Sequence, residues 1–265
     1  MPTNEQRRKA AKRKLERQIE RRAERARRRR QRLTIGAVVA VVVVIVAGVG
    51  VYLATRPSSP EAAPAAASGA CQYIAEGQAS RPVQNPDANP PRTGIVGLTL
   101  QTSQGAIPLT LDRAQAPCAV NAVASLAQQG FYNDTPCHRL TTGESLKVLQ
   151  CGDPTGTGSG GPGFRYAEEP PTNLAPSPLG QGASDYSRGL VAMAKTSDPD
   201  TTGSQFFLVY ADSALPPQYT VVGRISDAGL AVLDKVAAAG SDNSTGEGDG
   251  KPKLPVQITQ AQLQG

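Results

Sequence analysis

The chain has 265 residues, 39% of them hydrophobic, a formal net charge of +6 and a pI near 9.3. Residues 1–32 hold fifteen of the 28 basic residues and four of the 22 acidic ones, a net of +11, which leaves −5 for the rest. The high pI therefore describes a tail, and no basic surface for nucleic acid is expected on the remainder of the chain.

An apolar run without a charged residue follows the tail, from Leu33 to Ala54. As a helix its 22 residues rise about 33 Å, enough to cross the hydrocarbon core of a bilayer. Dense positive charge precedes the run and only Arg56 follows it closely, so the positive-inside rule keeps the N-terminus in the cytoplasm. We therefore expect a single-pass protein of the cell membrane, with a basic cytoplasmic tail at 1–32, a transmembrane helix at 33–54 and the rest exported. The tail is interpreted as a topology determinant, with binding to anionic lipids or to RNA as alternatives.

Residues 55–92 are rich in proline, alanine, serine and glycine, with seven prolines. Because prolines at this density preclude a long helix or a sheet, the segment is interpreted as a linker that lifts the next domain clear of the membrane. Local order is expected only near residues 71–73. The folded domain is placed at residues 93–265.

Alternating hydrophobic residues predict a β-hairpin over 94–111 with a turn at 103–105, and Pro117 opens a predicted helix that ends at Gly130. Strands at 137–141 and 146–151 follow, joined by a short turn. Further along, the pattern predicts a long irregular segment at 152–188, strands at 189–194, 204–210 and 220–225, a helix at 227–239, a glycine- and acid-rich turn, and a final strand at 256–263. Two helices and seven or eight mostly antiparallel strands indicate a mainly β domain, a closed barrel capped by helices.

Residue types that carry covalent catalysis or metal binding are sparse. His138 is the only histidine and has no serine or cysteine in a nucleophile motif beside it. The glycine-rich stretch 156–161 lacks the Lys-Ser/Thr pair of a phosphate loop. No Cys-x-x-Cys pair occurs, so a zinc site is not expected.

What remains is a set of motifs in a specific order. They are Phe131–Asp134, Cys137–Leu140, Leu149–Asp153, Gly189–Ala194, Thr202–Phe207 and Tyr219–Gly223. Together these motifs resemble the cyclophilin family of peptidyl-prolyl cis-trans isomerases, and the tail with its apolar run resembles membrane-anchored bacterial members. The resemblance implies a closed eight-stranded antiparallel barrel capped by two helices, which needs no cofactor and acts on proline-containing polypeptides. We expect a monomer.

The resemblance also implies roles for single residues. Arg139 matches the catalytic arginine, whose guanidinium stabilises the twisted prolyl amide by electrostatic preorganisation. Phe206 and Phe207 are neighbours in a strand and point to opposite faces, so one is core and only the other lines the site. The positions that match the proline pocket and its rim are Gln150, Met193, Ala194, Gln205, Phe207, Leu215 and Tyr219.

The chain departs from the family pattern near this pocket. Three more residues than usual separate Arg139 from Gln150, Lys147 stands where a pocket phenylalanine is expected, and Ala214 where many eukaryotic members carry tryptophan. Lys147 and the insertion favour an alternative function, a catalytically weak chaperone or binding module for proline-containing segments. The retained Arg139 favours an isomerase that assists the folding of exported proteins.

All four cysteines lie in the part expected to be exported, where disulfides are permitted. If Cys137 and Cys151 occupy facing strands of the hairpin around residues 143–144, they are cross-strand neighbours. Cys71 and Cys118 are then left to pair. This pairing is a hypothesis.

Overall fold

The structure, a computed structural model, describes residues 69–264. The predicted basic tail, the predicted transmembrane helix and the first part of the predicted linker fall outside the described residues. Within residues 69–264, no helix combines the length and the apolar character needed to cross a bilayer.

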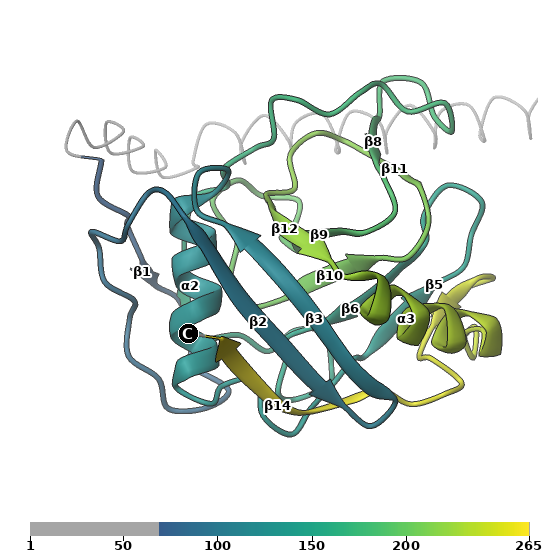
Figure 1. The fold of residues 1–265 in the computed structure, drawn as a ribbon, viewed down its shortest axis with the longest axis horizontal. Coiled ribbons are helices and arrows are strands. Elements are labelled where there is room, and N and C mark those ends of the chain that lie inside the picture. The colour runs from purple at the N-terminus through teal and green to yellow at the C-terminus, as the bar shows by residue number, and fades with distance from the viewer. Residues whose placement is uncertain (1–68, 265) are drawn as a thin grey trace, which may run out of the picture. The chain divides into compact units, whose positions relative to one another are not determined.

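One antiparallel sheet of ten strands forms the body of the described unit (Figure 1). In the order of neighbouring strands these are β13 (Asp249–Gly250), β5 (Arg139–Thr141), β6 (Val148–Cys151), β10 (Phe206–Val209), β9 (Leu190–Met193), β12 (Val221–Ile225), β3 (Gly105–Asp112), β2 (Ile95–Thr102), β14 (Gln257–Gln264) and β4 (Thr135–Pro136). Eight of these strands have three residues or more, and β4 and β13 have two each.

The sheet curls back on itself at β4 and β5. These strands lie toward opposite ends of the strand order, yet only Cys137 and His138 separate them in the sequence. The N–H of Cys137 donates to the carbonyl oxygen of Val256 at 2.9 Å, which continues the pairing across the junction. The eight longer strands thus belong to one curled antiparallel sheet, which agrees with the mainly β, antiparallel part of the expectation.

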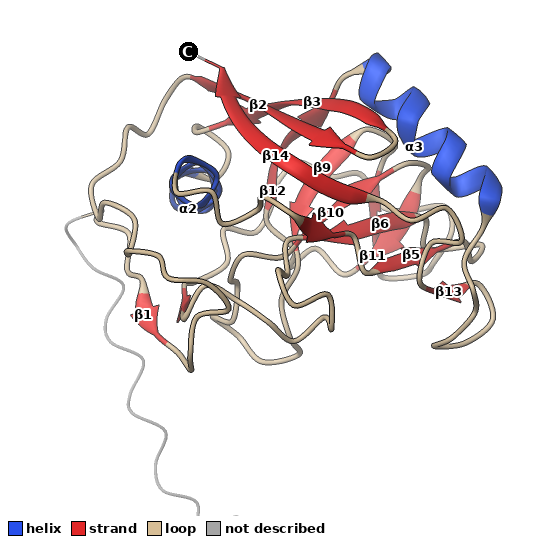
Figure 2. Ribbon diagram, turned by 90° about the horizontal axis from the view of Figure 1, so that it is seen from below, coloured by secondary structure: helices blue, strands red, loops and turns tan. Residues whose placement is uncertain are grey.

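Two helices in the described part of the chain pack on this sheet, α2 (Pro117–Gln128) and α3 (Asp227–Ala239). Figure 2 shows α2 end-on at one side of the strands and α3 lying along another side. No side chain of the residue before α2 caps it. Instead, the N–H groups of Cys118 and Ala119 donate to the carboxylate oxygens of Glu169 at 3.1 and 2.9 Å. A distant loop thereby satisfies the donors left open at the start of the helix.

Alternation along the strands separates two apolar clusters. In β10, Phe206 and Leu208 belong to the large core cluster that the sheet encloses with the helices. Phe207 and Val209 belong to a second, smaller cluster on the other face. The prediction that only one of the two adjacent phenylalanines is core is confirmed, and Phe207 is the one that leaves the core.

The N-terminal strap, residues 69–92, packs on the domain although its composition predicted a linker. Its short strand β1 (Ile74–Ala75) pairs with β7 (Phe164–Arg165). The ring of Tyr73 makes edge contacts with Phe164 and Tyr166, with centroids 5.4 and 5.6 Å apart. The boundary expected at residue 93 is therefore wrong, because aromatic packing and pairing outweigh the local preference of a proline-rich sequence for an open linker.

Two further contacts hold the strap. Cys71 is disulfide-bonded to Cys118 at the start of α2. The guanidinium of Arg81 donates to the carbonyl oxygens of Phe131, Asn133 and Asp134 in the turn after α2. The strap is thus fixed at both ends of that helix.

The long segment at 152–188 is mainly irregular, as predicted. The segment contains two short strands that the sequence pattern did not predict, β7 and β8 (Ser184–Tyr186). Strand β8 pairs with β11 (Ser213–Leu215) in a separate two-stranded sheet. The pairing places Leu215, a predicted pocket residue, beside the second apolar cluster.

Candidate active site

A row of paired residues crosses the outer face of the curled sheet. Arg139 in β5 pairs with Gln150 in β6, Gln150 pairs with Phe207 in β10, and Phe207 pairs with Ala192 in β9. Directly paired residues of antiparallel strands carry their side chains on the same face. The guanidinium of Arg139 therefore shares a face with the ring of Phe207.

Phe207 is the centre of an apolar patch on this face. Its side chain is 5% exposed, and its ring centroid lies 5.7 Å from that of Tyr219 and 6.4 Å from that of Tyr186. Ala194 and Leu215 are half-buried against the same cluster. Four of the predicted pocket residues, Ala194, Phe207, Leu215 and Tyr219, are thereby brought together.

Met193 does not belong to the apolar patch, which corrects the sequence prediction. Its side chain is 1% exposed and lies in the core cluster, because it points to the opposite face from its neighbours Ala192 and Ala194. Val148 lies in the patch instead. Val148 was not predicted from the sequence, although Val148 and Gln150 are two apart in one strand and must share a face.

Lys147 does not place its charge in the patch. Its ammonium group donates to the carbonyl oxygen of Glu144 at 2.9 Å, in the turn of the same hairpin. Leu146, the residue before it, packs against the second apolar cluster. An apolar side chain from the same hairpin thus contributes to the patch although Lys147 does not.

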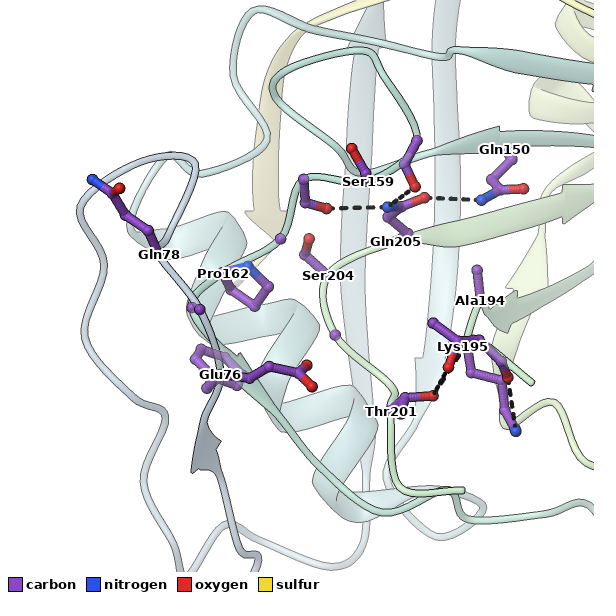
Figure 3. A pocket seen from close by; sticks show the side chains of 18 residues that line it. Glu76, Gln78, Gln150, Ser159, Pro162, Ala194, Lys195, Thr201, Ser204 and Gln205 are labelled. Atoms are coloured by element: carbon purple, nitrogen blue, oxygen red, sulfur yellow. Dashed lines mark hydrogen bonds between the residues drawn. The ribbon is translucent and has the colours of Figure 1, made fainter. Parts of the chain in front are cut away.

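A chain of hydrogen bonds connects Arg139 to the backbone of a glycine-rich loop. Nη1 of Arg139 donates to Oε1 of Gln150 at 3.5 Å, and Nε2 of Gln150 donates to Oε1 of Gln205 at 2.9 Å. Nε2 of Gln205 donates to the carbonyl oxygens of Gly158 and Gly160 at 2.9 and 3.0 Å (Figure 3). Because the carbonyl oxygens of Gly158 and Gly160 can only accept, they fix the orientation of the Gln205 amide, which in turn fixes that of the Gln150 amide.

The glycine loop, residues 154–161, is organised by the buried carboxylate of Asp153. Among the groups that donate to it are the N–H of Thr155 at 2.7 Å and that of Gly160 at 3.1 Å. Burial by itself raises the pKa of Asp153, but hydrogen bonds from Thr155 and the loop backbone outweigh burial and lower it below its usual value. A Cβ at Gly160 would lie 2.1 Å from the Asp153 carboxylate, so only glycine fits there.

His138 lies beneath this loop as a packed side chain. Neither of its ring nitrogens has a hydrogen-bond partner among the described residues. Burial lowers the pKa of His138, and the nearby charge of Asp153 opposes that shift only in part. His138 is therefore neutral at pH 7 and has no partner for acid–base catalysis among those residues.

A cleft of about 540 Å³ begins beside Gln150, Ala194 and Gln205. The glycine loop forms one side of it, and strap residues Glu76–Gln78 form another. In Figure 3 Glu76 and Gln78 lie on the strap side of the cleft, across from Ala194 and Lys195. This contribution was not predicted, because the proline-rich composition of the strap indicates a linker.

Arg139 is held from its other side by Asp249. Nε and Nη2 of Arg139 donate to the two carboxylate oxygens of Asp249 at 2.8 and 2.6 Å. The two side chains are 38% and 25% exposed, so the pair lies at the surface edge of the site. The hydrogen bonds to Asp249 raise the pKa of Arg139, which stays charged. From the sequence, the segment that contains Asp249 is predicted only to be a glycine- and acid-rich turn.

The second disulfide lies within the site's own framework. Cys137 is bonded to Cys151. Cys137 precedes Arg139 by two residues and Cys151 follows Gln150 directly. The bond therefore ties the segment just before β5 to the last residue of β6.

Comparison with known proteins places this site in a family. The family described as "Cyclophilin type peptidyl-prolyl cis-trans isomerase/CLD" matches residues 97–263. The probable peptidyl-prolyl cis-trans isomerases B of Mycobacterium leprae and Mycobacterium tuberculosis are each 48% identical over 198 residues, which is 73% of this chain. The match spans 66% and 63% of those two relatives, so the chain spans slightly less than two thirds of their length.

A solved structure gives the same result. The crystal structure of a cyclophilin-type isomerase from Cryptosporidium parvum aligns with a TM-score of 0.51 at 28% identity, and covers 65% of this chain and 99% of that one. A second crystal structure of that protein, in the presence of the dipeptide Ala-Pro, aligns with a TM-score of 0.50 at 29% identity, over 64% of this chain and 99% of that one. The fold and the matched motifs agree, and the chain belongs to the cyclophilin-type peptidyl-prolyl cis-trans isomerase family.

Proposed function

We propose that the chain catalyses cis–trans isomerisation of peptidyl-prolyl bonds. The observation that carries this proposal is the arginine of the site: Arg139, fixed on two sides, shares one sheet face with the apolar patch at Phe207. Membership of the family supports it. The Cryptosporidium parvum relative was crystallised in the presence of Ala-Pro, which supports a ligand of the X-Pro type here.

Rotation about a peptide bond is opposed by a resonance barrier of roughly 18–20 kcal/mol, and uncatalysed prolyl exchange takes about 10–100 s. No bond is broken, so the site needs only to hold the ring and to stabilise the twisted amide. The pyrrolidine ring packs on Phe207 and Leu215. Three of the five N–H groups of Arg139 are taken by Asp249 and Gln150, which leaves one on each terminal nitrogen to donate to the twisted amide.

The flanking peptide runs from the patch toward the cleft. Gln150 and Gln205 lie between the two, with their amides oriented by the glycine loop. Fixed polar groups at this point bind the backbone of the residue before proline without selecting its side chain. The proposed substrates are proline-containing polypeptides of varied sequence.

The deciding experiment is a prolyl isomerisation assay with the full 265-residue chain, disulfides oxidised, wild type against Arg139→Ala. Loss of a preorganised donor to a developing charge typically costs about 100-fold or more in rate, and we expect that loss here. Arg224→Ala, an exposed arginine on β12, is the matched control and should leave the rate unchanged. A folded wild type that binds proline peptides but does not accelerate exchange would instead be the chaperone or binding module.

For the cellular setting, we propose that residues 33–54 cross the membrane once, with residues 1–32 in the cytoplasm and the isomerase domain outside, acting on exported proteins as they fold. The charge asymmetry around the apolar run supports this orientation. Two disulfides in one domain are typical of oxidising compartments. Protease added to intact cells stripped of their wall should digest the domain and spare the tail; a protected domain, or a protein found in the soluble fraction, contradicts the proposal.

A further inference from the structure

The acid-rich loop, residues 240–253, connects α3 to β14 and carries Asp249 on the short strand β13. In the pairing of β13 with β5, Asp249 lies opposite Thr141. Arg139 precedes Thr141 by two residues, so Asp249 and Arg139 are diagonal neighbours on one face of the sheet. This register explains how the carboxylate reaches the guanidinium although the two residues are 110 apart in the sequence.

The acid-rich loop is held by its own side chains. Oδ1 of Asp242 accepts hydrogen bonds from the N–H of Ser244 at 3.0 Å and that of Lys251 at 2.8 Å. Oδ1 of Asn243 accepts from the N–H of Gly248 at 3.1 Å. A Cβ at Gly250 would lie 2.2 Å from Oδ1 of Asp242, so the loop closes tightly around a glycine. The backbone that carries Asp249 is therefore held in place by hydrogen bonds within the loop.

The contact with Asp249 is the stronger of the two that hold the guanidinium. It joins two nitrogens to two oxygens at 2.8 and 2.6 Å, which fixes both the position and the plane of the group. The contact with Gln150 is a single hydrogen bond at 3.5 Å, near the limit for one. Without Asp249 the long side chain of Arg139 would be free to rotate about several bonds, held at one weak point.

We propose that Asp249 is a positioning residue of the isomerase. It acts through Arg139, by turning the edge of the guanidinium that bears the free N–H groups toward the prolyl amide. The inference rests on the proposed isomerase function and deepens it. The carboxylate also lessens the positive potential at the amide, but both side chains are partly exposed, so water and salt screen that opposing effect. Orientation therefore outweighs charge.

The test compares Asp249→Asn, Asp249→Glu and wild type in the full chain, with kcat and KM measured for one proline peptide. We expect Asp249→Asn to lower kcat by about tenfold, equivalent to about 1.4 kcal/mol, with KM little changed. Asp249→Glu keeps the charge and should recover part of the rate. Glu247→Gln is the matched control, because it removes the same charge from an exposed side chain in the same loop, and should leave kcat unchanged.

A second measurement separates positioning from a general effect on folding. In an Arg139→Ala background, Asp249→Asn should lower the residual rate no further, since the two residues act as one unit. The NMR signal of the Arg139 Nε–H should show a restricted guanidinium in wild type and a freely rotating one in Asp249→Asn. If Asp249→Asn does not fold, Asp249→Glu is tested by the same two measurements, the rate in the Arg139→Ala background and the NMR signal of Arg139. A smaller loss of kcat is expected for this variant.

The outcomes are distinct. A folded wild type that does not accelerate exchange refutes the proposed function, while the NMR signal still tests the orientation of Arg139. An active wild type matched or exceeded by Asp249→Asn overturns the inference, because charge then outweighs orientation. A rate loss that persists in the Arg139→Ala background overturns it as well, because Asp249 then acts independently of Arg139.

Discussion

Replacing Cys71 and Cys118 together by alanine removes the covalent link between the strap and α2. The bond joins residues separated by 47 positions, and for a loop of that length the chain-entropy relation gives a loss of about 4 kcal/mol in the free energy of unfolding. Alanine is chosen because Cys71 is buried, where a serine hydroxyl would need a hydrogen-bond partner. The expected loss assumes that the strap unfolds together with the curled sheet.

The matched variant replaces Cys137 and Cys151, which are separated by 14 positions. The same relation gives about 3 kcal/mol for this shorter loop, so the first variant should be the less stable of the two by about 1 kcal/mol. Both variants lose two sulfur atoms from the folded domain. Cys137 and Cys151 also lie in the core cluster, whereas Cys118 is half-buried, so the cavity left by each truncation adds to the effect of loop length.

The assay is equilibrium unfolding in guanidinium chloride, followed by far-UV circular dichroism and by tyrosine emission, since the chain has seven tyrosines and no tryptophan. For a slope of about 4 kcal/mol/M, the midpoint of the Cys71→Ala/Cys118→Ala variant should fall by about 1 M. A separate early transition seen only by tyrosine emission would mean that the strap opens alone. That result, or a loss below about 1 kcal/mol, refutes the reasoning that the strap and the curled sheet form one cooperative unit.

Three further predictions concern single side chains. Phe207→Leu keeps the patch apolar but removes the flat ring, so we expect it to lower kcat/KM for a proline peptide and to cost about 1 kcal/mol of stability; unchanged kcat/KM would contradict the role of the ring. The pKa of His138 is lowered from 6.5 by burial, so the unfolded chain binds the proton more readily and stability should fall as the pH drops below 6.5. His138→Leu should lack this fall when unfolding is measured at about pH 7.5 and 5.5, and an identical fall in the variant would point to another group. Arg81→Ala removes charged donors from three carbonyl oxygens and should lower the free energy of unfolding by about 1.5–3 kcal/mol. Arg81→Lys should recover part of this loss. Equal stability of the two variants would contradict a role for the planar geometry of the guanidinium.

Features determined by local sequence were predicted correctly. The helix expected at 227–239 is α3 with the same bounds, because Ser226 caps it and Leu233 and Val236 recur on one face. The separation of Phe206 from Phe207 follows from the alternation of a strand alone. The sequence resemblance points to Arg139, Gln150, Gln205 and Phe207 as site residues, and the structure places these four side chains along one face.

Features that depend on distant partners were not predicted. The assignment of Met193 to the pocket was wrong, and Val148 was not predicted, because the assignment followed the motif and not the alternation of the strands. The strap was interpreted as a linker since its prolines describe only local preference, whereas its place depends on Tyr73 packing against Phe164 and Tyr166. Nothing in an acid-rich turn indicates which strand it will pair with. The contact of Asp249 with Arg139 could therefore be recognised only from the structure, in which β13 pairs with β5.

The position of β14 has a consequence for how the protein is made. This strand, residues 257–264, pairs with β2 on one side and with β4 on the other. A nascent chain that has not yet reached residue 257 leaves the edge of β2 open and the curl of the sheet unclosed. At a rate of synthesis of about 5–20 residues per second, β2 stays without this partner for many seconds. Premature termination within β14 would therefore leave the edge of β2 unpaired and free to pair with a strand of another chain.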